Sequence, residues 1–116
     1  MALTLTIWHN SRCSKSRQTL ALLREQGVEP IVRNYLEDAP NRAEIDRAAT
    51  CLGLSAAKFL RRGETEYKQS GLSNASSEDE IRDAMARFPK LIERPIVFSG
   101  DRAALGRPPE NVLSLL

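Results

Sequence analysis

The most constraining feature of this sequence is a strand–helix–strand pattern near its N-terminus. Leu3–Trp8 alternates apolar and polar side chains, as a half-buried strand does. A polar loop, His9–Arg17, leads into a helix that runs to about Gln26, and Pro30–Leu36 is typical of a second strand. Two strands joined through a helix pair in parallel with a right-handed crossover. The chain is therefore predicted to be an α/β protein.

Apolar positions in this pattern predict which side chains face the core. The helix places an apolar stripe inward and ends at Gly27, which suits the left-handed position after a helix. The residues expected to pack inward are Leu20, Leu22 and Leu23 of the helix and Ile31, Val32 and Tyr35 of the second strand.

The middle of the chain is predicted to be helical. Two capping boxes, each a polar residue followed three positions later by Glu, open the predicted helices: Asn41 with Glu44, and Ser77 with Glu80. The first helix is expected to stop at Gly53, and the second before Pro89. The polar segment between them, Gly63–Ser76, is predicted to be a loop.

The C-terminal part returns to strands. Pro95–Phe98 is short and apolar, and after a turn Arg102–Leu105 is expected to pair with it antiparallel. A last helix should follow Pro108 and bury Val112, Leu113 and Leu116. This order predicts a thioredoxin/glutaredoxin-like fold with a mixed four-stranded sheet. The whole chain, 1–116, is predicted to be one domain, with an all-helical insertion at about 40–90 between strands 2 and 3.

Composition excludes several classes of protein. The net charge of +2 is too balanced for a nucleic-acid-coating protein. Arg outnumbers Lys thirteen to four, which fits either oxyanion recognition or an exposed solubilising face. The N-terminus has no leader pattern, and no apolar run reaches the ~18 residues of a membrane span. Two cysteines and one histidine make neither a secreted disulfide framework nor a zinc site. We therefore expect a cytoplasmic protein with reduced thiols, no metal and no bound cofactor.

Cys13 lies where the first strand meets the first helix, and this position predicts a reactive thiol. Unpaired N–H groups and the helix dipole favour an anion there, and Arg12, Lys15 and Arg17 add positive charge. The thiolate is the nucleophilic form of cysteine. Cys51, by contrast, lies in an apolar helical stretch and is expected to be inert core.

The residues after Cys13 narrow the chemistry. Cys13-Ser14-Lys15-Ser16 is a C-x-x-S sequence, so a second, resolving thiol is missing from position 16. Arg17 gives C-x-x-x-R, which is not the longer loop of tyrosine-phosphatase-like enzymes. A nucleophile of this kind needs an external thiol for regeneration, and glutathione is the obvious candidate.

Four separated motifs together resemble the glutaredoxin-coupled arsenate reductase (ArsC) family, and the resemblance covers essentially the whole chain. They are the His9–Arg17 loop, Tyr35-Leu36-Glu37, Glu93–Val97, and Gly106–Glu110. The chain closely resembles the short members with a C-x-x-S loop. This resemblance implies that the protein reduces arsenate to arsenite, with glutathione and glutaredoxin as external reductants.

The resemblance also implies roles for particular residues. Cys13 matches the cysteine that attacks arsenate, and His9 matches a histidine that helps to keep it ionised. Independently of the resemblance, Ser16 is expected to support the site as a hydroxyl donor. Three arginines match those that hold the oxyanion: Arg61, Arg94 and Arg107. If the match to the family is shifted by one residue, Arg62 takes the role of Arg61. The Arg94-Pro95 bond is expected to be cis.

Two other functions fit the same sequence. One is a glutathione-linked monothiol oxidoreductase, in which Cys13 exchanges with mixed disulfides. The other is a non-enzymatic regulator similar to the Spx-type proteins, which share this fold and bind RNA polymerase. Those proteins typically carry a C-x-x-C switch, and Ser16 removes its second thiol.

Overall fold

The computed structural model describes residues 4–116, which form two compact units. The first unit combines the N-terminal segment up to Asp38 with Arg94–Leu116, and the second unit is the intervening Ala39–Glu93. The second unit therefore spans the segment predicted as a helical insertion. The prediction that the chain is a single domain stays a prediction.

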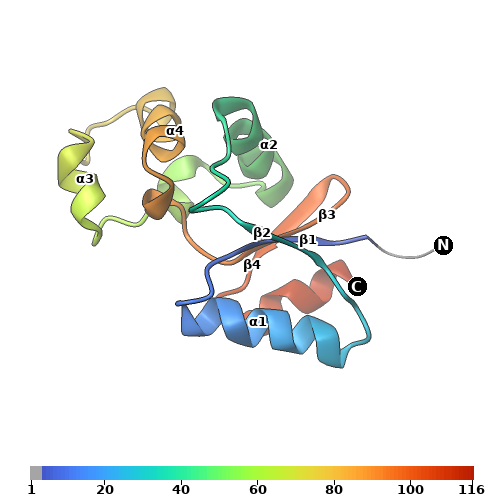
Figure 1. Ribbon diagram of the computed structural model, residues 1–116. Helices are drawn as coiled ribbons and strands as arrows, with labels where there is room; N and C mark the ends of the chain where they lie inside the picture. Colours follow the sequence, from blue (N-terminus) through green and yellow to red (C-terminus); the bar gives the residue numbers. More distant parts are fainter. Residues whose placement is uncertain (1–3) are drawn as a thin grey trace. The chain divides into compact units, whose positions relative to one another are not determined.

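Within the described residues, the first unit holds a mixed four-stranded sheet in the order β2-β1-β3-β4 (Figure 1). The strands are β1 (Thr6–His9), β2 (Ile31–Asn34), β3 (Ile96–Ser99) and β4 (Arg102–Leu105). β1 pairs with β2 in parallel and with β3 antiparallel, and β3 pairs with β4 antiparallel. These pairings confirm the predicted sheet. The predicted start of the first strand, Leu3, lies outside the described residues.

Helix α1 (Ser14–Glu25) and the 3₁₀ segment η3 (Pro109–Leu115) cover one face of this sheet (Figure 1). The face is closed by six buried apolar side chains, Leu5, Ile7, Leu23, Val97, Val112 and Leu115, with Leu20 and Leu22 packed partly buried against them. Gly27 adopts the left-handed conformation predicted for it, with φ of 82°. Because this core fixes α1 against β1, it also fixes the strand–helix junction that contains Cys13.

The second unit is a set of short helices. They are α2 (Arg42–Leu52), η1 (Ala56–Phe59), α3 (Thr65–Gln69), α4 (Glu78–Arg87) and η2 (Pro89–Leu91). Both predicted capping boxes are present, at the first turns of α2 and α4. Ile45 of α2 and Ile81 and Met85 of α4 are buried. A helix of this length gains most of its stability from such packing rather than from its own propensity.

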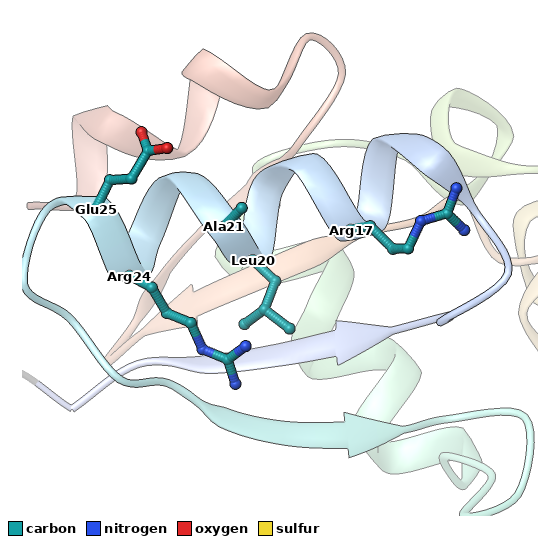
Figure 2. A pocket seen from close by; sticks show the side chains of 5 residues that line it. All are labelled: Arg17, Leu20, Ala21, Arg24 and Glu25. Atoms are coloured by element: carbon teal, nitrogen blue, oxygen red, sulfur yellow. The ribbon is translucent and has the colours of Figure 1, made fainter.

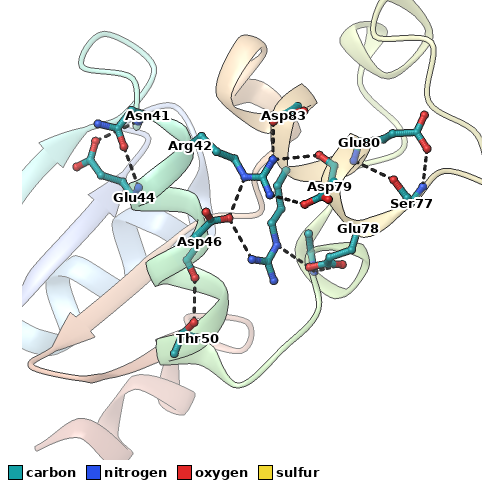
Figure 3. Close-up of polar contacts among 12 residues, drawn as sticks. Asn41, Arg42, Glu44, Asp46, Thr50, Ser77, Glu78, Asp79, Glu80 and Asp83 are labelled. Carbon is teal, nitrogen blue, oxygen red and sulfur yellow. Dashed lines mark hydrogen bonds and ion pairs between the residues drawn. The ribbon is translucent and has the colours of Figure 1, made fainter.

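Arg42 connects α2 to α4 through ion pairs (Figure 3). Its guanidinium lies 2.7 Å from Asp79 and 2.5 Å from Asp83 of α4, and 2.8 Å from Asp46 of its own helix. Arg82 of α4 also forms an ion pair with Asp46, at 3.0 Å. The Asp46 carboxylate is therefore shared between two arginines. These charged groups join the two longer helices of the second unit at its surface.

Several expectations about elements were wrong. Helix α1 begins at Ser14, so the residues after Cys13 are helical rather than part of a loop. Gly63–Ser76 contains α3, a helix of five residues in which none is buried. Ile31 and Val32 do not pack inward: they are 59% and 38% exposed, because β2 is an edge strand.

The C-terminal segment also differs in detail from its prediction. It is a 3₁₀ helix rather than an α-helix, and its inward residues are Val112 and Leu115. Leu113 and Leu116, which were expected to be buried, are 36% and 47% exposed. A 3₁₀ helix has three residues per turn, which brings positions 112 and 115 onto one face. Across residues 4–116, no helix is long and apolar enough to cross a membrane.

Candidate active site at the strand–helix junction

Cys13 is the N-cap residue of α1 and closes a tight turn that begins at Asn10. Its N–H donates to the carbonyl of Asn10 at 3.0 Å, and its own carbonyl accepts the first helical bond from the N–H of Arg17, also at 3.0 Å. Its backbone is extended, with φ of −94° and ψ of 123°, as an N-cap residue requires. The thiol therefore lies at the positive end of the helix dipole, as the sequence predicts.

Side chains of the turn and of α1 hold this loop in place. The Asn10 side-chain oxygen accepts from the N–H of Arg12 at 3.0 Å, which is an Asx turn. The guanidinium of Arg17 reaches back from the helix and donates to the carbonyl of Ser11 at 2.9 Å. The two contacts tie the turn both to itself and to the helix that follows it.

A buried pair, His9 and Ser16, lies beneath the loop. The Ser16 hydroxyl oxygen lies 2.6 Å from Nδ1 of His9 and accepts the N–H of Asn10 at 3.0 Å. Burial, followed by the positive charges of Arg24 and Arg17, lowers the pKa of His9, so the imidazole is neutral near pH 7. With Asn10 donating to the hydroxyl oxygen, the hydroxyl proton satisfies Nδ1 when the ring proton is on Nε2.

This contact places His9 against Ser16, and Ser16 in turn supports the turn that leads to Cys13. The role that the resemblance implies for His9, keeping Cys13 ionised, stays a prediction. The Ser16 hydroxyl is hydrogen-bonded both to His9 and to the N–H of Asn10. The serine of the C-x-x-S sequence therefore has a structural role, in addition to removing the second thiol.

Opposing influences act on the Cys13 thiol, and their sum lowers its pKa below the ordinary value. Partial burial is the largest single influence and raises the pKa. The N–H groups of Ser16 and Lys15 and the hydrogen bond and charge of the Arg94 guanidinium together outweigh it. The thiolate is therefore favoured by donors that come from two distant parts of the chain.

Arg107 is the second arginine at this thiol. Its Nη2 lies 3.4 Å from Sγ of Cys13, while its Nε donates to the carbonyl of Arg94 at 2.8 Å. The backbone that precedes Pro95 therefore holds the guanidinium that faces the sulfur. The Arg94-Pro95 bond is cis, as predicted, and the Arg107-Pro108 bond is cis as well, which the sequence analysis did not anticipate.

Arg61, the third predicted arginine, belongs to the second unit. Its Nη1 lies 2.6 Å from Glu93 and its Nε lies 3.1 Å from Glu64, and the side chain is mostly buried. Arg62 is exposed and donates to the carbonyl of Ala57 at 3.3 Å. Arg61 is thus held by two carboxylates within its own unit. The structure brings together Cys13, Arg94 and Arg107 within the first unit, and Arg61 belongs to the second unit.

Two of the hollows in the first unit involve α1 or the loop that precedes it. One, of about 550 Å³, lies along the outer side of α1, where Figure 2 shows Arg17, Leu20, Ala21, Arg24 and Glu25. The other, of about 200 Å³, lies at the ends of β1 and β2 and is lined by the His9–Arg12 turn with Asn34, Leu36 and Glu37. Among residues 4–116, no group of three or more His, Cys, Asp or Glu side chains could hold a metal ion.

Cys51 differs from its predicted state. It is partly exposed on α2 rather than buried in the core. Sequence reasoning also missed Asn10, whose side chain closes the turn, and Thr19 and Gly106, which meet between α1 and the segment leading to Arg107. Asn in a turn is a recognisable local signal. The contact between Thr19 and Gly106 has no local signal, because the two residues are 87 positions apart.

A mixed sheet, a cysteine capping its first helix and an arginine that precedes a cis proline and contacts the thiol define a thioredoxin-like protein with one thiol at the junction. The sequence model of the ArsC family matches residues 8–115, and the chain belongs to the ArsC family. This confirms both the resemblance and the predicted fold.

Individual relatives cover nearly the full chain. The solved structure of an arsenate reductase from Vibrio cholerae is 47% identical, with a TM-score of 0.94 over 100% of both chains. An arsenate reductase of Haemophilus influenzae is 42% identical over 98% of this chain and 100% of its own. An uncharacterized protein of Escherichia coli, YfgD, is 45% identical over 100% of this chain and 99% of its own.

Proposed function

We propose that this protein is an arsenate reductase in which Cys13 is the nucleophile. The observation that carries the proposal is the placement of two guanidinium groups, those of Arg94 and Arg107, at a thiol whose pKa is lowered. Family membership and the names of the relatives from Vibrio cholerae and Haemophilus influenzae support the same substrate.

The two arginines would act on the oxyanion as well as on the thiol. Arsenate carries one to two negative charges near neutral pH, so its approach to a thiolate is repulsive unless positive charge lies between them. Guanidinium groups bind oxyanions through paired, charge-assisted hydrogen bonds. Arg94 and Arg107 would neutralise the arsenate oxygens that face Cys13 and stabilise the charge that develops during attack. Arg61 would be the third ligand if it exchanges its carboxylate partners for the oxyanion.

The proposed reduction takes place in two steps. The Cys13 thiolate attacks arsenic, an As–S bond forms, and one arsenate oxygen leaves as water after taking up protons. A glutathione thiolate then attacks the Cys13 sulfur, the new S–S bond forms, and the electron pair of the S–As bond passes to arsenic. Arsenic(V) becomes arsenic(III) and leaves as arsenite, while the two thiols together lose two electrons.

Regeneration of Cys13 needs a further thiol. Position 16 is a serine whose hydroxyl is hydrogen-bonded to His9, so the mixed disulfide with glutathione has no neighbouring cysteine at that position to resolve it. A glutaredoxin thiol would take the glutathionyl group and release Cys13 as the thiolate. We place this cycle in the cytoplasm, where glutathione keeps thiols reduced, with no bound cofactor.

The test is arsenate-dependent oxidation of NADPH, coupled through glutathione, glutaredoxin and glutathione reductase. Wild type should turn over, Cys13→Ser should not, and Cys51→Ser is the matched control that removes the other thiol. Arg94→Ala and Arg107→Ala should raise the arsenate concentration needed for half-maximal rate while Cys13 still alkylates.

Failure of this test has a definite meaning. If the protein is folded and Cys13 is alkylated at pH values below the ordinary pKa of a cysteine, but no NADPH is oxidised with arsenate, the protein is not an arsenate reductase. Cys13-dependent reduction of a glutathionylated peptide in the same coupled system would then assign the monothiol oxidoreductase function. Capture of RNA polymerase regardless of Cys13 would instead assign the regulatory one.

A further inference from the structure

Gly106 is buried at the point where the last strand meets α1, and no side chain fits there. A Cβ atom on this residue would lie 2.4 Å from Oγ1 of Thr19, 2.7 Å from Cγ of Pro95 and 3.1 Å from Cγ2 of Thr19. The φ angle of Gly106 is outside the left-handed region. Glycine is therefore required at this position for space and not for backbone conformation.

Hydrogen bonds fix the same contact from both sides. The N–H of Gly106 donates to the carbonyl of Pro95 at 2.9 Å. The hydroxyl of Thr19 donates to the carbonyl of Lys15 within α1 at 2.8 Å and approaches the carbonyl of Gly106 at 3.4 Å. Thr19 is itself fully buried. The backbone at Gly106 thus packs tightly between Thr19 of α1 and the segment that contains the cis proline.

Both sides of this contact lead directly to the candidate active site. Thr19 belongs to the helix that Cys13 caps, and Gly106 is the residue before Arg107. Because protein interiors are close-packed, the separation of the two backbones is set by the small volumes of Gly106 and Thr19. That separation determines how near the Arg107 guanidinium comes to Cys13, which is 3.4 Å from Nη2 to Sγ.

We propose that Gly106 and Thr19 are positioning residues that set the distance between the Cys13 sulfur and the Arg107 guanidinium. Neither touches the sulfur. Gly106 acts through Arg107, and Thr19 acts through the helix that Cys13 caps. An added methyl group at Gly106 would push the Arg107 segment away from α1 and weaken one of the cationic contacts to the thiolate. The consequence for arsenate rests on the proposed function, whereas the consequence for the thiol does not.

The experiment measures the rate of Cys13 alkylation by iodoacetamide from pH 5 to 9.5, in a Cys51→Ser background so that one thiol reports. In Gly106→Ala the midpoint of this profile should move to higher pH, so that the variant reacts up to about tenfold more slowly than the parent at pH 6 and about equally fast above pH 9. A merely structural role would leave the shape of this pH profile unchanged. Gly63→Ala is the matched control, because a Cβ there meets nothing within 4 Å.

A second substitution tests the partner. Thr19→Ala removes two of the three close contacts to a new Cβ and leaves the one to Pro95, so Thr19→Ala combined with Gly106→Ala should recover part of the lost rate at pH 6. If Gly106→Ala does not fold, Thr19→Val gives the second probe. It keeps the volume but turns a methyl group toward the carbonyl of Gly106, and it should slow alkylation at pH 6 in the same direction.

Each outcome is decisive. Gly106→Ala, folded by circular dichroism and with the parent's pH profile, overturns the proposal, as does an unchanged profile in Thr19→Val. Failure of the double variant to recover overturns the role of Thr19. The profile needs no arsenate, so an absence of arsenate turnover in wild type would refute the proposed function and leave this inference standing. With turnover present, arsenate should protect Cys13 from iodoacetamide at a higher concentration in Gly106→Ala than in the parent.

Discussion

Replacement of Ser16 by Ala should destabilise the protein far more than a serine-to-alanine change usually does. The buried hydroxyl serves two groups, Nδ1 of His9 at 2.6 Å and the N–H of Asn10 at 3.0 Å. Each buried polar group that loses its partner costs about 1–3 kcal/mol. Asn10 is partly exposed, so water can compensate it in part, and we expect a total loss of about 2–4 kcal/mol.

Urea unfolding at pH 7.5 measures this loss. Trp8 is the single tryptophan of the sequence, is 5% exposed and precedes His9, so its fluorescence reports unfolding close to the substitution. With a slope of about 2 kcal/mol per molar urea, the midpoint should fall by roughly 1–2 M. Ser14→Ala is the matched control: Ser14 is exposed in the first turn of α1, and its loss should change stability by less than about 0.5 kcal/mol.

Equal midpoints for the two variants would refute the reasoning. That result would mean that the pair beneath the loop contributes nothing that water cannot replace, and that the turn before Cys13 is held by its other contacts alone. A large loss in Ser16→Ala with an unchanged rate of Cys13 alkylation would separate the two roles, since it would make Ser16 important for stability but not for the thiol.

Three further predictions concern the charged groups. Because the pKa of His9 is lowered in the folded protein, the unfolded chain binds its proton first, and stability should fall as pH drops through about 6.5; His9→Asn should flatten this part of a plot of urea midpoint against pH. The lowered pKa of Cys13 predicts that in Cys51→Ser the midpoint of its alkylation rate against pH lies below the ~8.5 of an ordinary cysteine, and a midpoint at or above that value would contradict the site geometry. Arg42→Met should lower the melting temperature in low salt, and the difference should narrow in 1 M NaCl, where screening acts over about 3 Å; a difference independent of salt would argue against the ion pairs.

The parts of the fold that depend on local interactions were predictable. The Asn41–Glu44 and Ser77–Glu80 capping boxes form within one turn, so the sequence alone carries the information. The parallel pairing of β1 with β2 followed from the strand–helix–strand order. The left-handed Gly27, with φ of 82°, followed from its place after a helix.

The predictions were wrong where the tertiary structure, and not the local sequence, determines burial or helix type. Ile31 and Val32 have strong strand propensity, but propensity does not say which strand lies at the edge of a sheet. The short helix Thr65–Gln69 buries none of its residues, so there was no apolar stripe from which to predict it. Leu113 was assigned to the core by α-helical spacing, whereas the segment is a 3₁₀ helix.

In the candidate site, too, local features were predictable from the sequence and contacts between distant segments were not. The position of Cys13 at a helix N-terminus was visible in the sequence, because the strand, the loop and the helix are consecutive. The selection of Arg94 and Arg107 among thirteen arginines needed the family motifs, since nothing local distinguishes them from surface charges. Thr19 and Gly106 were missed because only the folded chain brings them into contact.

The discontinuity of the first unit has a consequence for how the protein matures during synthesis. Cys13 leaves the ribosome early, but Arg107 follows 94 residues later, after the whole second unit has been made. β3, which pairs with β1 in the middle of the sheet, is also synthesised late. A nascent chain that ends before Arg94 would have a cysteine without the guanidinium that helps to lower its pKa. Thiol reactivity is therefore a property that the chain acquires near the end of translation, and the nucleophile is not fully formed until the fold that controls it is complete.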